Sequence, residues 1–335
     1  MRKAPERVLI IGTGSIAQRH MRNLGSQFPS AVVVCVSSTG RSLEKSEVPA
    51  TEISASIEDA LNIPPDFAIV ASPANLHLEH ALKILMRGIP VLVEKPLCIS
   101  LADDPYRLLL EGREKIGVGY NLRFLPSAQV VKNLLEKKEL GDITAAFAEV
   151  GQYLPDWRPG ADYKSGVSGQ KKLGGGALLE LSHELDYLQW IFGNFTQLMG
   201  TTRNSGQLGI DVEDNVDAML ITDQGGVVHV HLDFLQRAPS RTFKAVGDKA
   251  TLLWDILRNE VSLLLPGGER RLIYSDPGYD RNQMYTDQLN AFVDFAFGYG
   301  RFDSSFESAE RVMGLVDAIR ASDSSRKWIA IEERQ

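Results

Sequence analysis

The sequence predicts two regions of different fold class: an α/β domain built on a parallel sheet, followed by an α+β domain with a large, mostly antiparallel open sheet. Three observations predict this division. The chain has 335 residues, more than a single core usually holds. Short apolar runs alternate with helical patterns up to about residue 121, and longer strand patterns separated by glycine turns follow. We therefore expect domains at residues 1–121 and 122–335, with a last helix that can pack back on the first domain.

The elements of the first domain begin with the apolar run Val8–Ile11, as expected for a parallel strand covered on both faces. Helical spacing of apolar residues predicts a helix over 15–24, with Gly25 as its stop. Ser56 followed by Asp59 indicates the N-cap of a short helix. Further strands are predicted at residues 31–36, 67–71, 91–93 and 117–120, and further helices at 75–87 and 101–111. Strands separated by helices indicate right-handed βαβ units.

The second domain is expected to begin with a helix over residues 127–140. Gly-Gly, Pro-Gly-Gly and Gly-Asp turns indicate hairpins and a largely antiparallel sheet. Its strands are predicted at residues 143–150, 216–222, 227–235, 241–246 and 260–265, and its last helices at 284–297 and 308–321.

Charge and composition exclude several classes of function. The formal net charge of −7 argues against general nucleic-acid binding, which needs a basic surface. The N-terminal residues are too polar for a secretory signal, and no apolar run approaches the ~20 residues of a membrane span. We therefore expect a cytoplasmic protein with no membrane partner. Cys35 and Cys98 lie in apolar runs and read as buried free thiols, without zinc-ligand spacing.

A glycine-rich segment joins the first strand to the first helix. Gly12 permits a tight turn, Gly14 lets the backbone approach a pyrophosphate, and Ala17 allows close packing of helix and strand. Phosphates at this position would face a helix N-terminus, where free N–H groups favour anions. The context predicts a Rossmann dinucleotide-binding domain whose cofactor contacts are Gly12, Thr13, Gly14, Ser15 and Ile16.

The end of the second strand bears on the choice of dinucleotide. An enzyme that uses NAD usually has an acidic residue here, which binds the ribose hydroxyls. This chain has Ser37, Ser38 and Arg41, which suit a 2′-phosphate better. NADP is therefore favoured and NAD is possible. In the alternative interpretation Arg41 only solvates a loop and the enzyme accepts both cofactors.

Glu94, Lys95 and Pro96 follow the strand 91–93, at the carboxyl edge where open α/β sheets bind ligands. A partly desolvated lysine has a lowered pKa and can exchange a proton with a hydroxyl group. Glu94 can hold its ammonium group. The alternative for any single lysine at a strand end is a solvated surface charge.

Several segments together resemble the Gfo/Idh/MocA family, which includes glucose–fructose oxidoreductase and inositol dehydrogenase. They are residues 12–17, 72–77, 94–96, 120–124 and 174–186, so the similarity covers essentially the whole chain. The resemblance implies that Lys95 and His183 flank the substrate carbon, and that a cis peptide before Pro96 aims Lys95. It also implies cofactor contacts from Ser72, Pro73, Asn75, His77, Glu94, Lys95 and Asn121.

The acidic partner of His183 departs from the family pattern. Many members have Asp four residues before the histidine, where this chain has Leu179. Glu180, three residues before, and Asp186, three residues after, are the candidates on the same helix face. His183 itself can pass a hydroxyl proton; the alternative is a hydrogen-bonded helix histidine.

Substrate contacts are predicted in a loop of aromatic and charged residues. Trp157 can stack on a sugar, Arg158 can bind an anion, and Tyr153 and Arg123 complete the set. The alternative is a packed surface loop. His229, His231 and Asp233 alternate on one strand, which we interpret as a polar sheet face in a subunit interface. No metal is expected, and the protein is expected to be a homodimer or homotetramer.

The sequence thus predicts an NAD(P)-dependent oxidoreductase that transfers hydride between nicotinamide and a secondary alcohol or ketone of a sugar, polyol or nucleotide-sugar. Lys95 and His183 move the proton. Two alternatives remain open at this point: a sugar redox catalyst that retains its cofactor, and a non-catalytic NADP-binding regulator.

Overall fold

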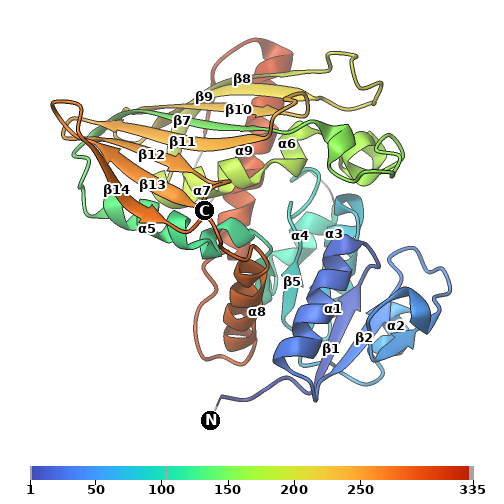
Figure 1. The fold of residues 1–335 in the computed structure, drawn as a ribbon. Helices are drawn as coiled ribbons and strands as arrows, with labels where there is room; N and C mark the ends of the chain where they lie inside the picture. Colours follow the sequence, from blue (N-terminus) through green and yellow to red (C-terminus); the bar gives the residue numbers. More distant parts are fainter. Residues whose placement is uncertain (1, 103, 332–335) are drawn as a thin grey trace. The chain divides into compact units, whose positions relative to one another are not determined.

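The computed structural model describes residues 2–102 and 104–331 and divides into two compact units (Figure 1). The first unit holds the chain up to Asn121 together with Arg281–Glu310, and the second holds Leu122–Asp280 and the chain from Arg311. A single boundary at residue 121 therefore does not describe the division. The segment 281–310 returns to the first unit because its helix buries Phe292 edge-on against Phe67, with ring centroids 5.5 Å apart.

The first unit contains a parallel sheet in the order β3-β2-β1-β4-β5-β6. This is the strand order of a dinucleotide-binding fold, in which the order reverses between β1 and β4 and leaves a crevice at their carboxyl ends. The strands are β1 (Arg7–Ile11), β2 (Val32–Val36), β3 (Glu52–Ser54), β4 (Phe67–Val70), β5 (Val91–Val93) and β6 (Ile116–Val118). The sequence analysis did not predict β3, which has three residues and none fully buried.

The helices of the first unit are α1 (Ser15–Gln27), α2 (Ile57–Ala60), α3 (His77–Leu85), α4 (Asp104–Leu109) and α8 (Gln283–Ala296). The Ser56 cap is confirmed, because its hydroxyl accepts the Asp59 N–H at 3.0 Å. Gly25 does not end α1, which continues to Gln27. A glycine inside a helix costs about 1 kcal/mol, and the buried side chains of Ala17, Met21 and Leu24 outweigh that cost.

The second unit contains a sheet in the order β14-β13-β12-β11-β7-β10-β9-β8-β15. Its neighbours are antiparallel except β7 and β10, which are parallel. The strands are β7 (Ile143–Gly151), β8 (Phe195–Arg203), β9 (Asn215–Thr222), β10 (Val227–Asp233), β11 (Ser240–Gly247), β12 (Thr251–Asp255), β13 (Glu260–Leu264), β14 (Arg270–Ser275) and β15 (Ile329–Ala330). The expected large, mostly antiparallel sheet is confirmed.

Helices α5 (Pro126–Glu136), α6 (Ala177–Glu180) and α7 (His183–Phe192) pack on one face of this sheet. Trp254 of β12 lies in the core there, donates to Ser127 of α5 at 2.8 Å and meets the Tyr187 ring of α7 at 5.3 Å. Helix α9 (Phe306–Ser325) begins in the first unit and ends beside β8, where the Ser322 hydroxyl accepts the Gly200 N–H at 3.0 Å. Helix α5 ends four residues earlier than expected, and Lys138 behind it is left-handed, with φ of 53°.

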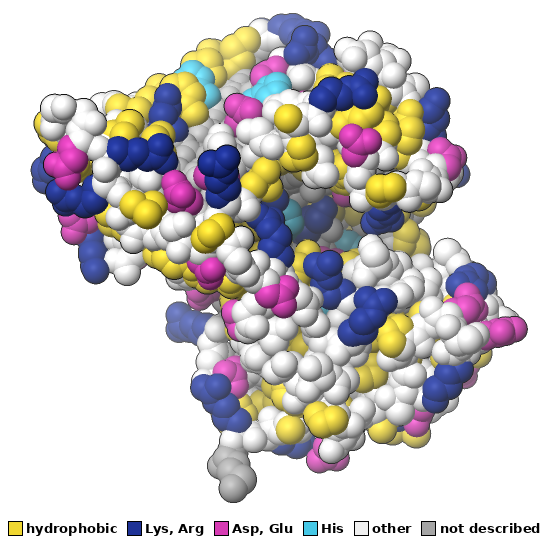
Figure 2. All heavy atoms as spheres, in the orientation of Figure 1, with side chains coloured by type: hydrophobic (Ala, Val, Ile, Leu, Met, Phe, Trp, Pro, Cys, Tyr) yellow, Lys and Arg dark blue, Asp and Glu magenta, His cyan; other side chains and the backbone are white. Residues whose placement is uncertain are grey.

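Charged side chains of both signs are interspersed on the visible surface of each unit, without a large basic field (Figure 2). Within residues 2–102 and 104–331, no helix has the length and apolar character that crossing a membrane would require.

Candidate active site

The glycine-rich loop lies at the carboxyl end of β1 and leads into α1. Gly12 has φ of +125°, and a Cβ there would lie 2.3 Å from the carbonyl oxygen of Ala71. The loop thus touches the end of β4 so closely that only glycine fits. Gly14 is the exposed N-cap of α1, and a Cβ there would have no atom within 4 Å. The helix N-terminus is therefore open to an anion, and the residues present fit a dinucleotide pyrophosphate.

The loop after β2 keeps no acidic residue at the strand end. Ser37 is buried, and its hydroxyl lies 3.2 Å from that of Thr39, which shapes the turn. Arg41 is exposed and forms an ion pair with Glu47, with 2.6 Å between guanidinium nitrogen and carboxylate oxygen. The hydrogen bond from Arg41 lowers the pKa of Glu47. The carboxylate that pairs with Arg41 thus belongs to a residue six positions further along the chain.

The segment Glu94-Lys95-Pro96 follows β5 at the same sheet edge. The Lys95–Pro96 peptide bond is cis, as the family resemblance implies. Lys95 is half-buried, whereas Glu94 before it and Pro96 after it are buried. The Glu94 carboxylate accepts a hydrogen bond from the ring Nε2 of His20 at 2.7 Å and from the Lys95 backbone N–H at 3.3 Å.

His77, the first residue of α3, is 1 % exposed. Its Nδ1 lies 2.7 Å from the carbonyl oxygen of Pro96, and its Nε2 lies 2.8 Å from that of Ser72. Burial lowers the pKa of His77, while the hydrogen bonds to these two carbonyls oppose that effect. The ring therefore joins the loop after β4 to the loop after β5. Of the other expected cofactor contacts nearby, Asn75 is exposed and Asn121 is buried.

In the second unit, His183 is half-buried at the start of α7, and Glu180 is half-buried at the end of α6. The glycines before α6 give room to a half-buried acid, Glu213, which was not considered from the sequence. A Cβ at Gly176 would lie 2.3 Å from Oε1 of Glu213, which also accepts the Leu178 N–H at 3.2 Å. Burial raises the pKa of Glu213.

Arg123 and Asp186 form a buried ion pair in the second unit. The guanidinium donates to both carboxylate oxygens, with Nε–Oδ2 at 3.0 Å and Nη2–Oδ1 at 2.6 Å. The exposed fractions of their side chains are 3 % and 0 %. From the sequence, Arg123 was expected to contact the substrate and Asp186 to support His183. In the structure the two side chains pair with each other, and each charge compensates the other in the buried interior. Glu184 is paired in the same way with Arg241 at 2.7 Å.

The aromatic loop expected to bind substrate is packed on its own unit. Trp157 donates through its ring N–H to the Gln152 carbonyl at 3.2 Å and lies edge-on to Phe234, with centroids 5.2 Å apart. Tyr153 is covered by the guanidinium of Arg237, 3.6 Å from its ring centroid. Arg158 is exposed.

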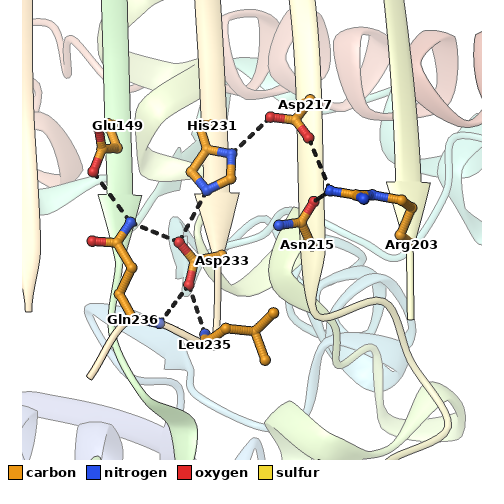
Figure 3. A network of polar contacts seen from close by, with 8 residues as sticks. All are labelled: Glu149, Arg203, Asn215, Asp217, His231, Asp233, Leu235 and Gln236. Atoms are coloured by element: carbon orange, nitrogen blue, oxygen red, sulfur yellow. Dashed lines mark hydrogen bonds and ion pairs between the residues drawn. The ribbon is translucent and has the colours of Figure 1, made fainter. Parts of the chain in front are cut away.

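His231 belongs to a polar network on the sheet of the second unit (Figure 3). Its Nδ1 lies 2.7 Å from a carboxylate oxygen of Asp217, and its Nε2 lies 3.0 Å from one of Asp233. In the part of the chain that the structure describes, no group of three or more His, Cys, Asp or Glu side chains is arranged so that it could hold a metal ion. His229 stacks on Phe147, with 4.8 Å between the ring centroids.

His20 is a site residue that the sequence analysis missed. It lies on the buried face of α1 with Ala17, Met21 and Leu24. A histidine at an apolar position of an amphipathic helix is the signal that could have identified it, because a buried polar ring requires a partner.

Two family models match the chain. One, described as "Oxidoreductase family, NAD-binding Rossmann fold", matches residues 6–106, and the "GFO/IDH/MocA C-terminal domain" matches residues 128–253. The D-glucoside 3-dehydrogenase of Escherichia coli is 27 % identical over 75 % of this chain and 77 % of its own length. The inositol 2-dehydrogenase 1 of Saccharopolyspora erythraea is 26 % identical over 87 % and 86 %. A shorter match, 35 % identical, joins 41 % of this chain to 40 % of the glucose-6-phosphate 3-dehydrogenase of Bacillus subtilis.

Solved structures share the fold across nearly the whole chain. Levoglucosan dehydrogenase in complex with NADH and L-sorbose aligns with a TM-score of 0.85 and 20 % identity, over 98 % of this chain and 99 % of that one. A myo-inositol dehydrogenase from Corynebacterium glutamicum aligns with a TM-score of 0.78 and 19 % identity, over 99 % and 100 %.

Proposed function

The chain belongs to the GFO/IDH/MocA oxidoreductase family, and from this premise we propose that it transfers hydride between a nicotinamide dinucleotide and a secondary alcohol or ketone of a sugar, polyol or nucleotide-sugar. It is an NAD-binding oxidoreductase of the sugar and polyol dehydrogenase type. The observation that carries the proposal is the place of Lys95: half-buried after β5, at the sheet edge that also holds the glycine-rich loop.

In the proposed reaction a bound nicotinamide supplies the hydride acceptor or donor. Lys95, in its neutral form, accepts the substrate hydroxyl proton at Nζ as the carbon loses hydride and the C=O bond forms; in reduction it returns that proton. His183 is the second proton-transfer group. Lys95 is flanked by two buried residues, Glu94 and Pro96, which partly exclude water from it.

For the cofactor we propose NADP in preference to NAD. Ser37, Ser38 and Arg41 follow β2, and no carboxylate stands at the strand end to bind a free ribose 2′-hydroxyl or repel a 2′-phosphate. The ion pair of Arg41 with Glu47 is exposed, so a phosphate can replace the carboxylate at little cost.

The proposed activity is tested by following dinucleotide reduction at 340 nm with NAD and NADP in parallel. The substrates are myo-inositol, glucose, a methyl glucoside, glucose 6-phosphate, levoglucosan and a UDP-sugar. Turnover of at least one substrate, faster with NADP, is expected. A clear preference for NAD contradicts the argument from Ser38 and Arg41, and no turnover with any dinucleotide contradicts the enzyme proposal.

Two alternatives have distinct outcomes in this experiment. A catalyst that retains its cofactor converts substrate, followed by chromatography, without net release of reduced dinucleotide. A regulator binds dinucleotide without converting any substrate.

We further propose that the open face of the sheet pairs with a second copy of the chain. One row across the strands holds three apolar side chains and one histidine, in the order Phe147, His229, Met219 and Met199. The three apolar side chains of this row are 38–39 % exposed, and they line a shallow hollow of about 390 Å³. An adjacent row carries Glu149, His231 and Asp217, so the surface holds both charge signs and can be complementary to itself.

A further inference from the structure

Lys95 has a fixed neighbour on each side, and each neighbour is held by a buried histidine from a different helix. Glu94 before it binds His20 of α1, and Pro96 after it binds His77 of α3. All of these residues belong to the first unit. The catalytic mechanism described above uses neither histidine.

The contact between His20 and Glu94 is a buried pair. His20 is 0 % exposed and Glu94 is 7 % exposed, and their atoms lie 2.7 Å apart. Because carboxylate oxygens accept, the ring donates from Nε2; its Nδ1 has no hydrogen-bond partner among the described residues. Gly119 lies close to the same carboxylate, since a Cβ there would be 2.9 Å from Oε2 of Glu94. Glu94 is therefore held by the His20 ring, in a space that a side chain at position 119 would enter.

The contact between His77 and Pro96 fixes the other side of Lys95. Both ring nitrogens of His77 face backbone carbonyl oxygens, with Nδ1 2.7 Å from that of Pro96 and Nε2 2.8 Å from that of Ser72. A neutral ring donates to one of the two, and in the Nδ1–H tautomer it donates to Pro96. Because the acceptor on Pro96 is a backbone oxygen, this hydrogen bond fixes the backbone of the segment that follows Lys95. It also ties that segment to the end of β4, against which Gly12 packs.

The two attachments matter because proton transfer tolerates only a small range of distances and angles between the reacting atoms. A displacement of about 1 Å at a catalytic group can cost about 10²-fold in rate. The backbone of Lys95 lies between two attachment points, and the position of its Nζ depends on both.

We propose that His20 and His77 are positioning residues for Lys95, acting through the Glu94 carboxylate and the Pro96 carbonyl. This inference rests on the proposed function, in which Lys95 moves the substrate proton. Both histidines are expected to affect kcat. Because His77 is 1 % exposed and both of its ring nitrogens face backbone carbonyl oxygens, we propose that its side chain makes no cofactor contact of its own, in contrast to the expectation from the family resemblance. Substitution of either histidine is therefore expected to leave dinucleotide affinity nearly unchanged.

The test uses two pairs of variants of the full chain. His20→Leu and His77→Leu remove the donors; His20→Gln keeps a donor near Nε2, and His77→Asn keeps one near Nδ1. With the best substrate of the dinucleotide screen, we expect each leucine variant to lose at least about tenfold in kcat, with dinucleotide Kd within about threefold. The amide variants are expected to recover most of the loss. His80→Leu is the matched control, because His80 is buried on α3 and binds the Ser72 hydroxyl at 3.0 Å.

A positioning role has a second signature, which a merely structural histidine lacks. In a Lys95→Met background, the leucine substitutions are expected to cause no further loss of residual kcat, because residues that act through one group are not additive. Equal losses in both backgrounds, or a loss in His80→Leu as large as in the other two, would overturn the proposal.

A readout without turnover separates this inference from the proposed function. In the cofactor-free protein, proton–nitrogen NMR is expected to show slowly exchanging ring N–H protons at Nε2 of His20 and on His77. Their absence contradicts the two attachments. If Lys95→Met keeps full turnover, the proposed function fails, whereas these ring protons still report whether the attachments exist.

Discussion

Two glycines at the start of α1 have different physical roles, although both belong to one motif. Gly12 is confined by the carbonyl of Ala71 and by its positive φ, whereas Gly14 borders open space. The first is required for folding of the loop, and the second keeps the helix N-terminus accessible to a ligand.

Gly12→Ala is therefore expected to destabilise the protein by about 1–3 kcal/mol, because a left-handed backbone and a close contact are both strained. Urea unfolding measures this change. Gly14→Ala is the matched control: we expect a stability change within about 0.5 kcal/mol, but at least tenfold weaker dinucleotide binding. Equal destabilisation by both substitutions contradicts the assigned roles.

Residues in local motifs could be predicted from sequence, and residues defined by long-range partners could not. The glycine loop and Lys95 occupy positions that a strand and its next turn define. The pairing of Arg123 with Asp186 joins residues 63 apart in the chain, and that of His20 with Glu94 joins residues 74 apart. The local sequence pattern does not reveal such partners, so neither of these two pairs was predicted.

At the scale of elements, the fully buried strands were predicted and most of the missed strands are exposed. Strand β12, with alternating burial, was also missed. The fully buried strands β4 and β5 read as continuous apolar runs. In contrast, β14 is the edge strand RRLIYS, in which no residue is buried, and β8 carries only two buried residues in nine. Hydrophobic periodicity cannot mark a strand whose faces are both exposed.

The contacts of His231 on β10 with Asp217 on β9 and Asp233 on β10 make the stability of the protein depend on pH. The hydrogen bond to Asp233, then that to Asp217, raises the pKa of His231 to about 9. The folded-state pKa thus lies above the value of about 6.5 in an unfolded chain. The protonated ring contributes stability fully below about pH 6.5, and that contribution is lost as pH rises through about 9.

His231→Gln is accordingly expected to lower the urea midpoint most near pH 6 and to have little effect near pH 10. Asp217→Asn removes one of the two carboxylates, so its effect on the urea midpoint should also be greatest near pH 6, but smaller than that of His231→Gln. The measurement is urea unfolding from pH 6 to 10 at one protein concentration. A constant difference between wild type and His231→Gln at all pH values contradicts a charged ring in the folded state.

At the scale of the whole molecule, the order of the two units along the chain could be predicted from the sequence. The return of segment 281–310 to the first unit could not. Helix α8 is amphipathic, and its apolar face suits either core. Contacts with distant residues decide its place: Asn282 donates to Asn23 at 2.9 Å, and the Arg19 guanidinium lies 4.3 Å from the centroid of the Tyr285 ring.

The proposed pairing of two chains is tested by Met219→Lys, which puts a charge in the middle of the apolar row. A charge buried without a partner opposes association, so we expect the wild type to sediment as a dimer or tetramer and the variant as a smaller species. Met86→Lys is the matched control, since Met86 is 78 % exposed in the first unit. A monomeric wild type, or an unchanged Met219→Lys assembly, contradicts the interface.

Lys95 is the residue that we propose moves the proton in a dinucleotide-dependent oxidation of a carbohydrate-type alcohol. The most direct measurement compares kcat and dinucleotide Kd of the wild type and Lys95→Met with the best substrate. Removal of a general acid–base group typically costs 10²–10⁴-fold, so we expect kcat to fall by at least about 10²-fold while Kd changes less than about threefold. Full turnover by Lys95→Met would contradict the account.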